Sequence, residues 1–320
     1  MEVLRETNFN FLGEKKTGKV RDIYIQPDRL ILITTDRHSS FDRIIAHIPW
    51  KGQVLNQISA WWFEQTKDIV PNAVIAVPDP NVTVAKKMKM VPVEAVMRGY
   101  LTGVTDTAIW TRYSAGQREF GDLKLPDGMK KNEKLPHPIF DPTTKEEGHD
   151  RAITQEQMVS EGLVTKELLN KVRETATKLF LRGQEIAAKR GLILVDTKYE
   201  FGLSAEASAK AGTDENGALV LIDEIHTPDS SRYWQTEGYE ERMAAGEQPK
   251  SFDKEFLRLW FKENCDPYKD ATLPDAPQEL VEELSRRYIQ MYEQVTGKKF
   301  EPGELPVLPR MERNLKQYAA

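Results

Sequence analysis

The segment LILVDTKYEFG (192–202) constrains the fold of this 320-residue chain more than any other stretch. Asp196, Lys198 and Glu200 stand at spacing i, i+2, i+4 in an otherwise mostly apolar run. Because side chains alternate faces along a strand, the three charges share one face, and the residues between them face a core. Those core-facing positions are Val195, Thr197, Tyr199 and Phe201. Three charges on so apolar a strand are costly unless they meet water, a metal or a ligand.

A second apolar run, ALVLIDEIHT (218–227), is the expected hairpin partner of this strand and ends in carboxylates. Asp223 would then lie beside Glu200 across the ladder. Two neighbouring carboxylates repel each other, and a divalent cation relieves that repulsion. Magnesium is held by one or two carboxylates plus substrate phosphates, so the pair suits a magnesium–nucleotide site. The alternative interpretation of the same spacing is a strand face exposed to solvent, on which a lysine pairs with a glutamate.

Two arginines stand where an anion could be held. Arg232 follows the turn residues of HTPDSS, next to Ser230, and arginine with hydroxyl and backbone donors suits a phosphate or carboxylate. Arg98 is followed by Gly99 and Gly103, which permit close approach of the backbone to a ligand. The alternative for Arg232 is an ordinary turn with a surface arginine. The alternative for Arg98 and its glycines is a purely structural role.

The segment GEKKTGKVRDIY (13–24) is a weaker phosphate signal, because its glycines form neither a GxGxxG nor a Walker pattern. Lys19 and Arg21 are expected on one face of the strand that follows. The histidines lack zinc-ligand spacing and GxSxG is absent, so neither a zinc enzyme nor a serine hydrolase is indicated.

The remaining chain reads as α+β, with mainly antiparallel sheets and helices packed against them. Strands are expected at 18–25 and 30–36, which form a hairpin, and at 73–77, 82–88, 91–98, 192–201 and 218–227. Helices are expected after Gly52, at 165–191 and, as the two closing helices, at 253–264 and 277–297; Thr154 and Gln157 suit a capping box. Residues 35–43 look like a loop. The polar stretch 114–153 is either an ordered wall or a mobile lid.

Composition excludes several classes of protein. The net charge is −5, so no global basic surface points to nucleic acid. No apolar run approaches the roughly 18 residues of a membrane helix, and the first residues lack a signal peptide's apolar stretch. The single cysteine, Cys265, fits a reducing compartment. We therefore expect a cytoplasmic globular protein without nucleic-acid or membrane partners.

Together these segments closely resemble the phosphoribosylaminoimidazole-succinocarboxamide synthase (SAICAR synthetase) family in its longer form. The resemblance covers most of the chain and runs, in family order, through GKVRDIY, TTDRHSSFD, VPVEAVMRGYLTG, LPDGMKKNEKLP, PTTKEEGHD, GLILVDTKYEFG and LIDEIHTPDSSRYW. The resemblance implies a two-lobed fold related in layout to ATP-grasp and protein-kinase nucleotide-binding folds. The first lobe would be residues 1–97, a sheet that covers ATP. The second would be residues 98–320, which carry the sites for the metal, for the ribonucleotide substrate (the ribotide) and for aspartate.

The resemblance also implies an activity. The family is an ATP-dependent ligase of de novo purine biosynthesis that joins 5-aminoimidazole-4-carboxylate ribonucleotide (CAIR) to L-aspartate. The products are SAICAR, ADP and phosphate, and the reaction passes through an acyl phosphate. ATP is a substrate and Mg²⁺ the cofactor, and the oligomeric state is left as monomer or homodimer.

The family's site residues carry over onto matching positions of this sequence. The residues implied as catalytic are Lys19, Asp196 and Lys198. Those implied for ATP are Lys19, Arg21, Val93, Glu94 and Lys198, with Glu200 and Asp223 as the metal carboxylates. Those implied for CAIR and aspartate are Asp36, Ser39, Ser40, Asp42, Arg98, Lys145, His149, Asp150, Ser230 and Arg232.

One position departs from the family pattern. After RGYLTG the family commonly has a serine that contacts phosphate, and this chain has Val104. Either Thr102 or Thr105 supplies the hydroxyl instead, or one phosphate contact is missing. The general base for the aspartate amine is either Asp36 or Asp196. A small-molecule kinase and a non-catalytic nucleotide-binding module are the rival functions; the kinase signatures HRD and DFG are absent.

Overall fold

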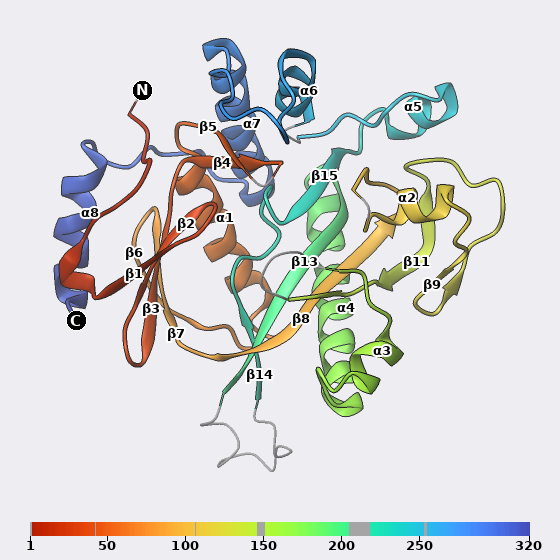
Figure 1. Ribbon diagram of the computed structural model, residues 1–320, viewed down its shortest axis with the longest axis horizontal. Helices are drawn as coiled ribbons and strands as arrows, with labels where there is room; N and C mark the ends of the chain where they lie inside the picture. The colour runs from red at the N-terminus through yellow and green to blue at the C-terminus, as the bar shows by residue number, and fades with distance from the viewer. Residues whose placement is uncertain (1, 42, 106, 146–150, 205–217, 253–254) are drawn as a thin grey trace. The chain divides into compact units, whose positions relative to one another are not determined.

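The computed structural model describes residues 2–41, 43–105, 107–145, 151–204, 218–252 and 255–320. The chain divides into two compact units. Unit 1 comprises residues 1–62, 73–87 and 252–320, and unit 2 comprises residues 63–72 and 88–251. Figure 1 labels the elements of both.

Unit 1 is built on a five-stranded antiparallel sheet in the order β1-β2-β3-β7-β6. Its strands are β1 (Glu14–Thr17), β2 (Arg21–Ile25), β3 (Arg29–Thr34), β7 (Val82–Lys86) and β6 (Val74–Asp79). The predicted hairpin of 18–25 and 30–36 is confirmed as β2 and β3. The predicted loop 35–43 is wrong, since β4 (Arg37–Ser40) and β5 (Arg43–His47) pair there as a short ladder. Polar residues can form this ladder because backbone hydrogen bonds, which need no apolar side chain, hold it.

The helical elements of unit 1 include one that the sequence did not reveal. Besides the first part of α1 (Lys51–Thr66), the unit contains η1 (Asn10–Leu12), α6 (Glu255–Asn264), α7 (Gln278–Thr296), α8 (Val307–Leu315) and η2 (Lys316–Tyr318). α6 and α7 were predicted, whereas α8 was missed because it is short and rich in charge. Arg310 of α8 is buried, and its guanidinium forms two hydrogen bonds with Asp79, at 2.9 and 3.0 Å. Val307, Met311 and Leu315 join the core formed by Ile31, Ile33, Val82 and Val84.

Unit 2 is built on a six-stranded antiparallel sheet. The order β11-β8-β13-β14 is extended by β12, which pairs with β8, and by β15, which pairs with β13. The strands are β8 (Lys89–Tyr100), β11 (Lys134–Phe140), β12 (Thr143–Thr144), β13 (Leu192–Ser204), β14 (Ala218–Ile222) and β15 (Ser231–Gln235). β8 and β13 run side by side through the middle of this sheet (Figure 1).

The main helix of unit 2 is α4 (Lys166–Ala188), which packs against β13, β8 and β11. It buries an apolar stripe that includes Leu168, Val172, Leu179 and Phe180. The smaller elements are α2 (Ile109–Ser114), α3 (Gln155–Ser160), α5 (Tyr239–Ala245) and the pair β9 (Glu119–Phe120) and β10 (Leu123–Lys124). The predicted capping box of Thr154 and Gln157 is confirmed at the start of α3.

The two units divide the chain differently from the expected lobes 1–97 and 98–320. Residue 97 lies inside β8, which is one continuous strand from Lys89 to Tyr100, so a boundary there would cut a ladder. In addition, residues 252–320 belong to unit 1, because α8 packs onto β6. The C-terminal segment packs with unit 1 through contacts between residues that are far apart in the sequence. Local sequence patterns do not reveal such contacts.

None of the described helices combines the length and the apolar character that a membrane-spanning helix needs.

Candidate active site

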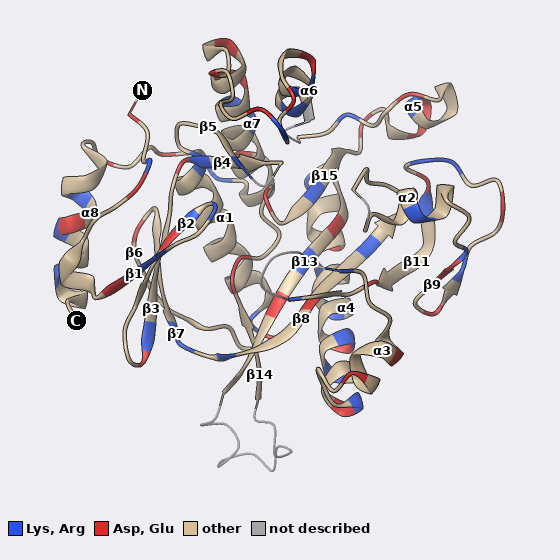
Figure 2. Ribbon diagram, in the orientation of Figure 1, with Lys and Arg blue, Asp and Glu red and all other residues tan. Residues whose placement is uncertain are grey.

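The centre of the candidate site is the polar face of β13. As predicted, Asp196, Lys198 and Glu200 alternate with fully or nearly fully buried residues. Asp196 lies opposite Arg98 of β8 on one side and opposite Arg232 of β15 on the other. Glu200 lies opposite Glu94 of β8. Directly opposed residues of a ladder share a face, so these charges gather on one surface of the sheet. Figure 2 shows the alternation of acidic and basic positions along β13.

At one end of this face, four charged side chains form the lysine–glutamate cluster, defined as Glu94, Lys145, Lys198 and Glu200. Nζ of Lys198 donates to Oε1 of Glu94 at 2.9 Å and to Oε1 of Glu200 at 2.5 Å. Nζ of Lys145 donates to the same two oxygens at 2.9 and 2.7 Å. Each lysine therefore bridges both glutamates, and Thr143 adds a hydroxyl hydrogen bond to Glu94 at 3.2 Å.

The charges of the cluster stabilise one another despite their burial. Burial raises the pKa of Glu94, but Lys198 and Lys145 outweigh burial and hold the pKa below its usual value. Burial likewise lowers the pKa of Lys198, whereas Glu200, Asp223 and Glu94 together raise it well above its usual value. The same competition leaves the pKa of Lys145 raised. Glu94, Lys145 and Lys198 are therefore charged near neutral pH.

Asp223 joins the cluster by a route that differs from the prediction. Ile222, not Asp223, lies across the ladder from Glu200. A regular continuation of β14 would place Asp223 opposite Tyr199, which faces the core. Instead Asp223 adopts a left-handed conformation with φ of 60°, which ends the strand alternation. Its charge raises the pKa of Lys198, so the carboxylate lies close enough to interact with that ammonium group.

The donor chemistry of this end fits a divalent cation held jointly with a substrate. Among the described residues, no group of three or more His, Cys, Asp or Glu side chains could hold a metal ion on its own. Glu94 and Glu200 bond the ammonium of Lys198, and Asp223 interacts with it electrostatically. With Lys145, which bonds both glutamates, the formal net charge of these five groups is −1. Magnesium commonly takes one or two carboxylates and completes its shell with phosphates and water, so a pair of ligands is sufficient.

At the other end of the face lies the arginine cluster, defined as Arg98, Arg112, Asp141, Asp196 and Arg232. Nη1 of Arg232 donates to Oδ2 of Asp196 at 2.9 Å. Nε of Arg98 donates to Oδ2 of Asp141 at 2.5 Å, and Arg112 donates to the same oxygen. Three guanidinium groups thus face two carboxylates, and the net charge of this end is +1.

The loop after β8 contacts both arginines that the sequence analysis singled out. The carbonyl of Thr107 accepts a hydrogen bond from Nη2 of Arg98 at 3.1 Å. Gly103 has a φ of +100°, and a Cβ placed on it would be 2.5 Å from Cβ of Ala108 and 3.1 Å from Nη1 of Arg232. Glycine is therefore favoured there by its backbone conformation and by the contact with Ala108, and it lets the loop lie beside the guanidinium of Arg232.

The same loop decides between the two threonines proposed to replace the family's serine. The hydroxyl of Thr102 is buried and donates to Oδ1 of Asn132 at 2.7 Å. Val104 and Thr105 are exposed. Thr105 therefore remains the candidate for a hydroxyl contact with phosphate.

Ser230 lies in the turn between β14 and β15. Its hydroxyl accepts from the backbone N–H of Thr227 at 3.2 Å, and its carbonyl accepts from the N–H of Lys198 at 3.2 Å. The hydroxyls of Ser231 and Thr197 lie 2.7 Å apart. These bonds attach the turn to β13 and so fix the strand that carries Arg232.

A buried pair on the opposite face of β13 was missed by the sequence analysis. The hydroxyl of Tyr199 lies 2.5 Å from Nε2 of His226, and the carbonyl of His226 accepts from the hydroxyl of Tyr233 at 2.9 Å. Both ring systems are inaccessible to solvent. Gly183 of α4 makes room for the imidazole, since a Cβ there would be 2.4 Å from its Cε1. The pair anchors the segment that follows Asp223.

We expect His226 to make the protein less stable as the pH falls. Burial lowers the pKa of His226 to about 3, so the native state keeps the ring neutral while the unfolded chain takes up a proton below its ordinary value of 6.5. Between pH 7 and pH 5.5 this difference removes about 1 kcal/mol from the free energy of unfolding. Urea unfolding should show that the free energy of unfolding falls less between pH 7 and pH 5.5 in His226→Gln than in the wild type, by about that amount. An equal loss in wild type and variant would contradict this, and His137→Gln, at an exposed histidine, is the control.

Five described site residues proposed from the resemblance belong to unit 1. Lys19 is exposed in the turn between β1 and β2, and not on the strand as predicted, whereas Arg21 is the first residue of β2. The reason is that the lysine-rich segment forms a hairpin of its own, with β1 paired to β2. Ser39 and Ser40 lie on β4, where the hydroxyl of Ser40 accepts from Nε of Arg258 at 3.2 Å.

Asp36, the fifth of these residues, serves as an anchor for the protein backbone. Its Oδ2 accepts from the N–H of Leu4 at 2.7 Å, and its Oδ1 accepts from the N–H of Gly52, in the first turn of α1, at 2.9 Å. Burial raises its pKa to about 6. Both oxygens are thus committed to backbone groups, which favours Asp196 over Asp36 as the general base.

Of the remaining proposed site residues, one is buried in the sheet and three lie outside the part of the chain that the structure describes. Val93 is 2% exposed on β8, on the face opposite Glu94, and pairs with Thr144. Asp42, His149 and Asp150 lie outside the described residues, as does part of the stretch 114–153. The described part of that stretch includes β11 and β12, which are integral strands of the sheet.

Comparison with known proteins gives a consistent result. The family model described as SAICAR synthetase matches residues 14–274. A phosphoribosylaminoimidazole-succinocarboxamide synthase from Legionella pneumophila (strain Paris) is 54% identical over an alignment of 319 residues that covers 98% of this chain and 98% of that one. A chloroplastic protein of the same name from Arabidopsis thaliana is 52% identical, covering 96% of this chain and 72% of that one.

Solved structures agree. The SAICAR-synthase from Saccharomyces cerevisiae complexed with SAICAR has a TM-score of 0.78 at 31% identity and covers 93% of this chain and all of its own. A SAICAR synthetase (Type-2) in complex with ADP has a TM-score of 0.65 at 27% identity and covers 90% of this chain and all of its own.

Proposed function

The chain belongs to the SAICAR synthetase family, and from this premise we propose which of its residues perform the family's reaction. The protein is an ATP-dependent ligase of purine biosynthesis that joins CAIR to L-aspartate and forms SAICAR, ADP and phosphate. One observation supports the assignment of residues above all: one face of the unit 2 sheet holds glutamates bridged by lysines at one end, where Asp223 also acts on Lys198, and an excess of arginines at the other.

The lysine–glutamate cluster is the end that would bind MgATP. Glu200 and Asp223 would hold Mg²⁺, which when bound neutralises part of the charge on the nucleotide phosphates. Lys198 carries its positive charge between these carboxylates and would stabilise the charge that develops on the transferred phosphoryl group. Glu94 is assigned to the nucleotide as well; its bonds to Lys198 and Lys145 keep both ammonium groups in position.

The arginine cluster is the end that would bind the ribotide phosphate. Arg98 and Arg232 flank Asp196 on neighbouring strands, and their guanidinium groups can donate paired hydrogen bonds to phosphate oxygens. Ser230, in the turn before Arg232, completes this side, whereas Lys145, which the resemblance assigns to CAIR and aspartate, lies at the lysine–glutamate end. The CAIR carboxylate would then point along β13 toward the lysine–glutamate cluster, where the γ-phosphate is delivered.

The chemistry needs positioning and charge neutralisation rather than a covalent enzyme nucleophile. A carboxylate oxygen of CAIR attacks the γ-phosphorus of ATP and ADP leaves, which gives an acyl phosphate. The aspartate amine then attacks the acyl carbon, phosphate leaves, and the amine loses a proton. Asp196 is the proposed acceptor of that proton, because it stands two residues before Lys198 on the same face of β13 and its bond to Arg232 uses only Oδ2.

The remaining assignments follow the family resemblance and belong to the same proposal. Lys19, Arg21 and Val93 would contact ATP. Asp36, Ser39, Ser40 and Asp42 would line the CAIR and aspartate sites, together with His149 and Asp150. We propose that the enzyme acts in the cytoplasm as a monomer or homodimer, a location that its single cysteine fits.

The test is ADP release from MgATP with CAIR, measured with and without L-aspartate. We expect release that requires both CAIR and aspartate, with one SAICAR formed per ADP. Release that ignores aspartate would indicate a small-molecule kinase. Nucleotide binding without any release would indicate a non-catalytic module.

A further inference from the structure

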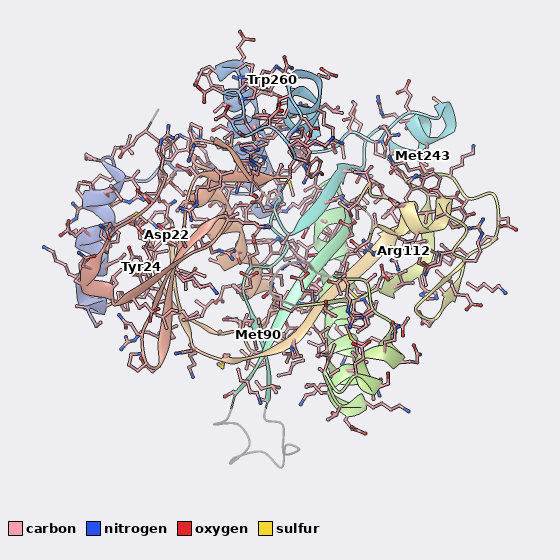
Figure 3. The ribbon with its side chains drawn as sticks, viewed as in Figure 1. Asp22, Tyr24, Met90, Arg112, Met243 and Trp260 are labelled. Atoms are coloured by element: carbon pink, nitrogen blue, oxygen red, sulfur yellow. The ribbon has the colours of Figure 1, made fainter. Side chains whose placement is uncertain are left out.

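Arg112 is a member of the arginine cluster that no sequence motif singles out. It lies on α2, near the end of β8 (Figures 1 and 3). Its guanidinium bonds Oδ2 of Asp141, the same oxygen that accepts from Arg98, and its Cζ lies 5.1 Å from the ring centre of Phe120. The three side chains are largely buried, with 18%, 10% and 7% exposure for Arg112, Asp141 and Arg98.

The geometry makes Arg112 decisive for the charge of this end. Without it, Arg98 and Arg232 would be balanced by Asp141 and Asp196, and the net charge would be zero. An end with no net charge, and with each arginine paired to a carboxylate, has little attraction for a phosphate. Because Arg112 and Arg98 share one carboxylate, a positive charge is left over.

We propose that Arg112 is a positioning residue for the ribotide phosphate: it neutralises Asp141, so that Arg98 remains oriented by Asp141 and yet keeps its charge for the phosphate. This inference rests on the proposed function, since it assumes that Arg98 and Arg232 bind that phosphate. It adds a determinant of CAIR affinity at a position that the sequence motifs quoted for the resemblance do not include.

The first variant is Arg112→Met, which keeps a long apolar side chain against Phe120 but removes the charge. We expect the KM for CAIR to rise roughly tenfold, as for the loss of one unit charge near a phosphate at a partly buried site. The KM for ATP and kcat should change less than twofold. Arg118→Met is the matched control, because Arg118 also stacks on an aromatic ring, that of Tyr113, and also pairs with an aspartate, Asp127.

The charge count gives a rescue experiment that a structural role would not satisfy. In the double variant Arg112→Met with Asp141→Asn the net charge returns to +1, and the asparagine oxygen can still accept from Arg98. The KM for CAIR should therefore fall back to within threefold of the wild-type value. Arg112→Lys, which retains the charge, should stay within threefold as well.

The outcomes separate this inference from the proposed function. A normal KM for CAIR in Arg112→Met, a tenfold rise in Arg112→Lys, or no rescue in the double variant would each overturn the role of Arg112. If Arg112→Met fails to fold, Arg112→Lys and the double variant decide between the same alternatives. Arg232→Ala tests the phosphate site itself, and a normal KM there would overturn the assignment of the arginine cluster and this inference with it.

Discussion

Replacing Asp223 by asparagine is expected to lower kcat by about a thousandfold or more, equivalent to about 4 kcal/mol of transition-state stabilisation, and to leave the fold intact. The substitution keeps the size of the side chain but removes one of the three carboxylates around Lys198. The remaining glutamates are already bridged by two lysines, so the cluster would lose its net negative charge and one of its two proposed magnesium ligands.

The measurement is steady-state turnover at increasing Mg²⁺ concentration, with the unfolding temperature as the check on folding. Near-normal kcat at saturating Mg²⁺ would contradict the metal assignment. Asp127→Asn is the control, since its carboxylate is 90% exposed and pairs with Arg118 away from β13. We expect that control to behave as wild type.

Arg232→Ala is expected to raise the KM for CAIR by about fiftyfold or more, since charge-assisted bonds to a phosphate are among the strongest hydrogen bonds. The KM for ATP should change little, because Arg232 lies opposite Asp196 and not opposite the lysine–glutamate cluster. Loss of the guanidinium also leaves Asp196 without its 2.9 Å partner, which adds a negative charge where the phosphate would bind.

Arg182→Ala provides a matched control for this variant. Arg182 also belongs to unit 2, pairs with Asp68 at 2.9 Å, and has the same 34% exposure as Arg232. Its loss should leave both KM values unchanged. If Arg232→Ala weakened CAIR and ATP to the same extent, Arg232 would not be a specific phosphate ligand of the ribotide.

The sequence predicted the central strand well because its physics is local. The alternation in β13 depends only on the period of a strand, so the shared face of Asp196, Lys198 and Glu200 followed from spacing alone. The hairpin of β13 and β14 followed for the same reason, as did the amphipathic helix α4.

The position of Asp223 shows the limit of such reasoning. The expected ladder assumed that residues alternate regularly between the two faces. The left-handed conformation of Asp223 ends this alternation and changes the face toward which the segment is directed. Sequence spacing carries no direct sign of a positive φ at an aspartate, although Asp and Asn are the side chains that best tolerate it.

The rest of the site depends on contacts between distant segments. Lys145 joins Glu94 and Glu200 because β12 pairs with β8, which in turn pairs with β13. Arg112 meets Arg98 only through Asp141, 29 residues further along the chain. No sequence pattern within residues 100–145 predicts either of these contacts. The family resemblance assigned Lys145 to the substrates but did not indicate its two carboxylate partners.

The central claim is that the two ends of one sheet face bind different substrates. Calorimetric titration of CAIR into Asp223→Asn and Arg232→Ala, in the absence of nucleotide and metal, tests it most directly. We expect near wild-type CAIR affinity in Asp223→Asn and an affinity at least tenfold weaker in Arg232→Ala. Equal weakening in both variants, or weakening in Asp223→Asn alone, would contradict it.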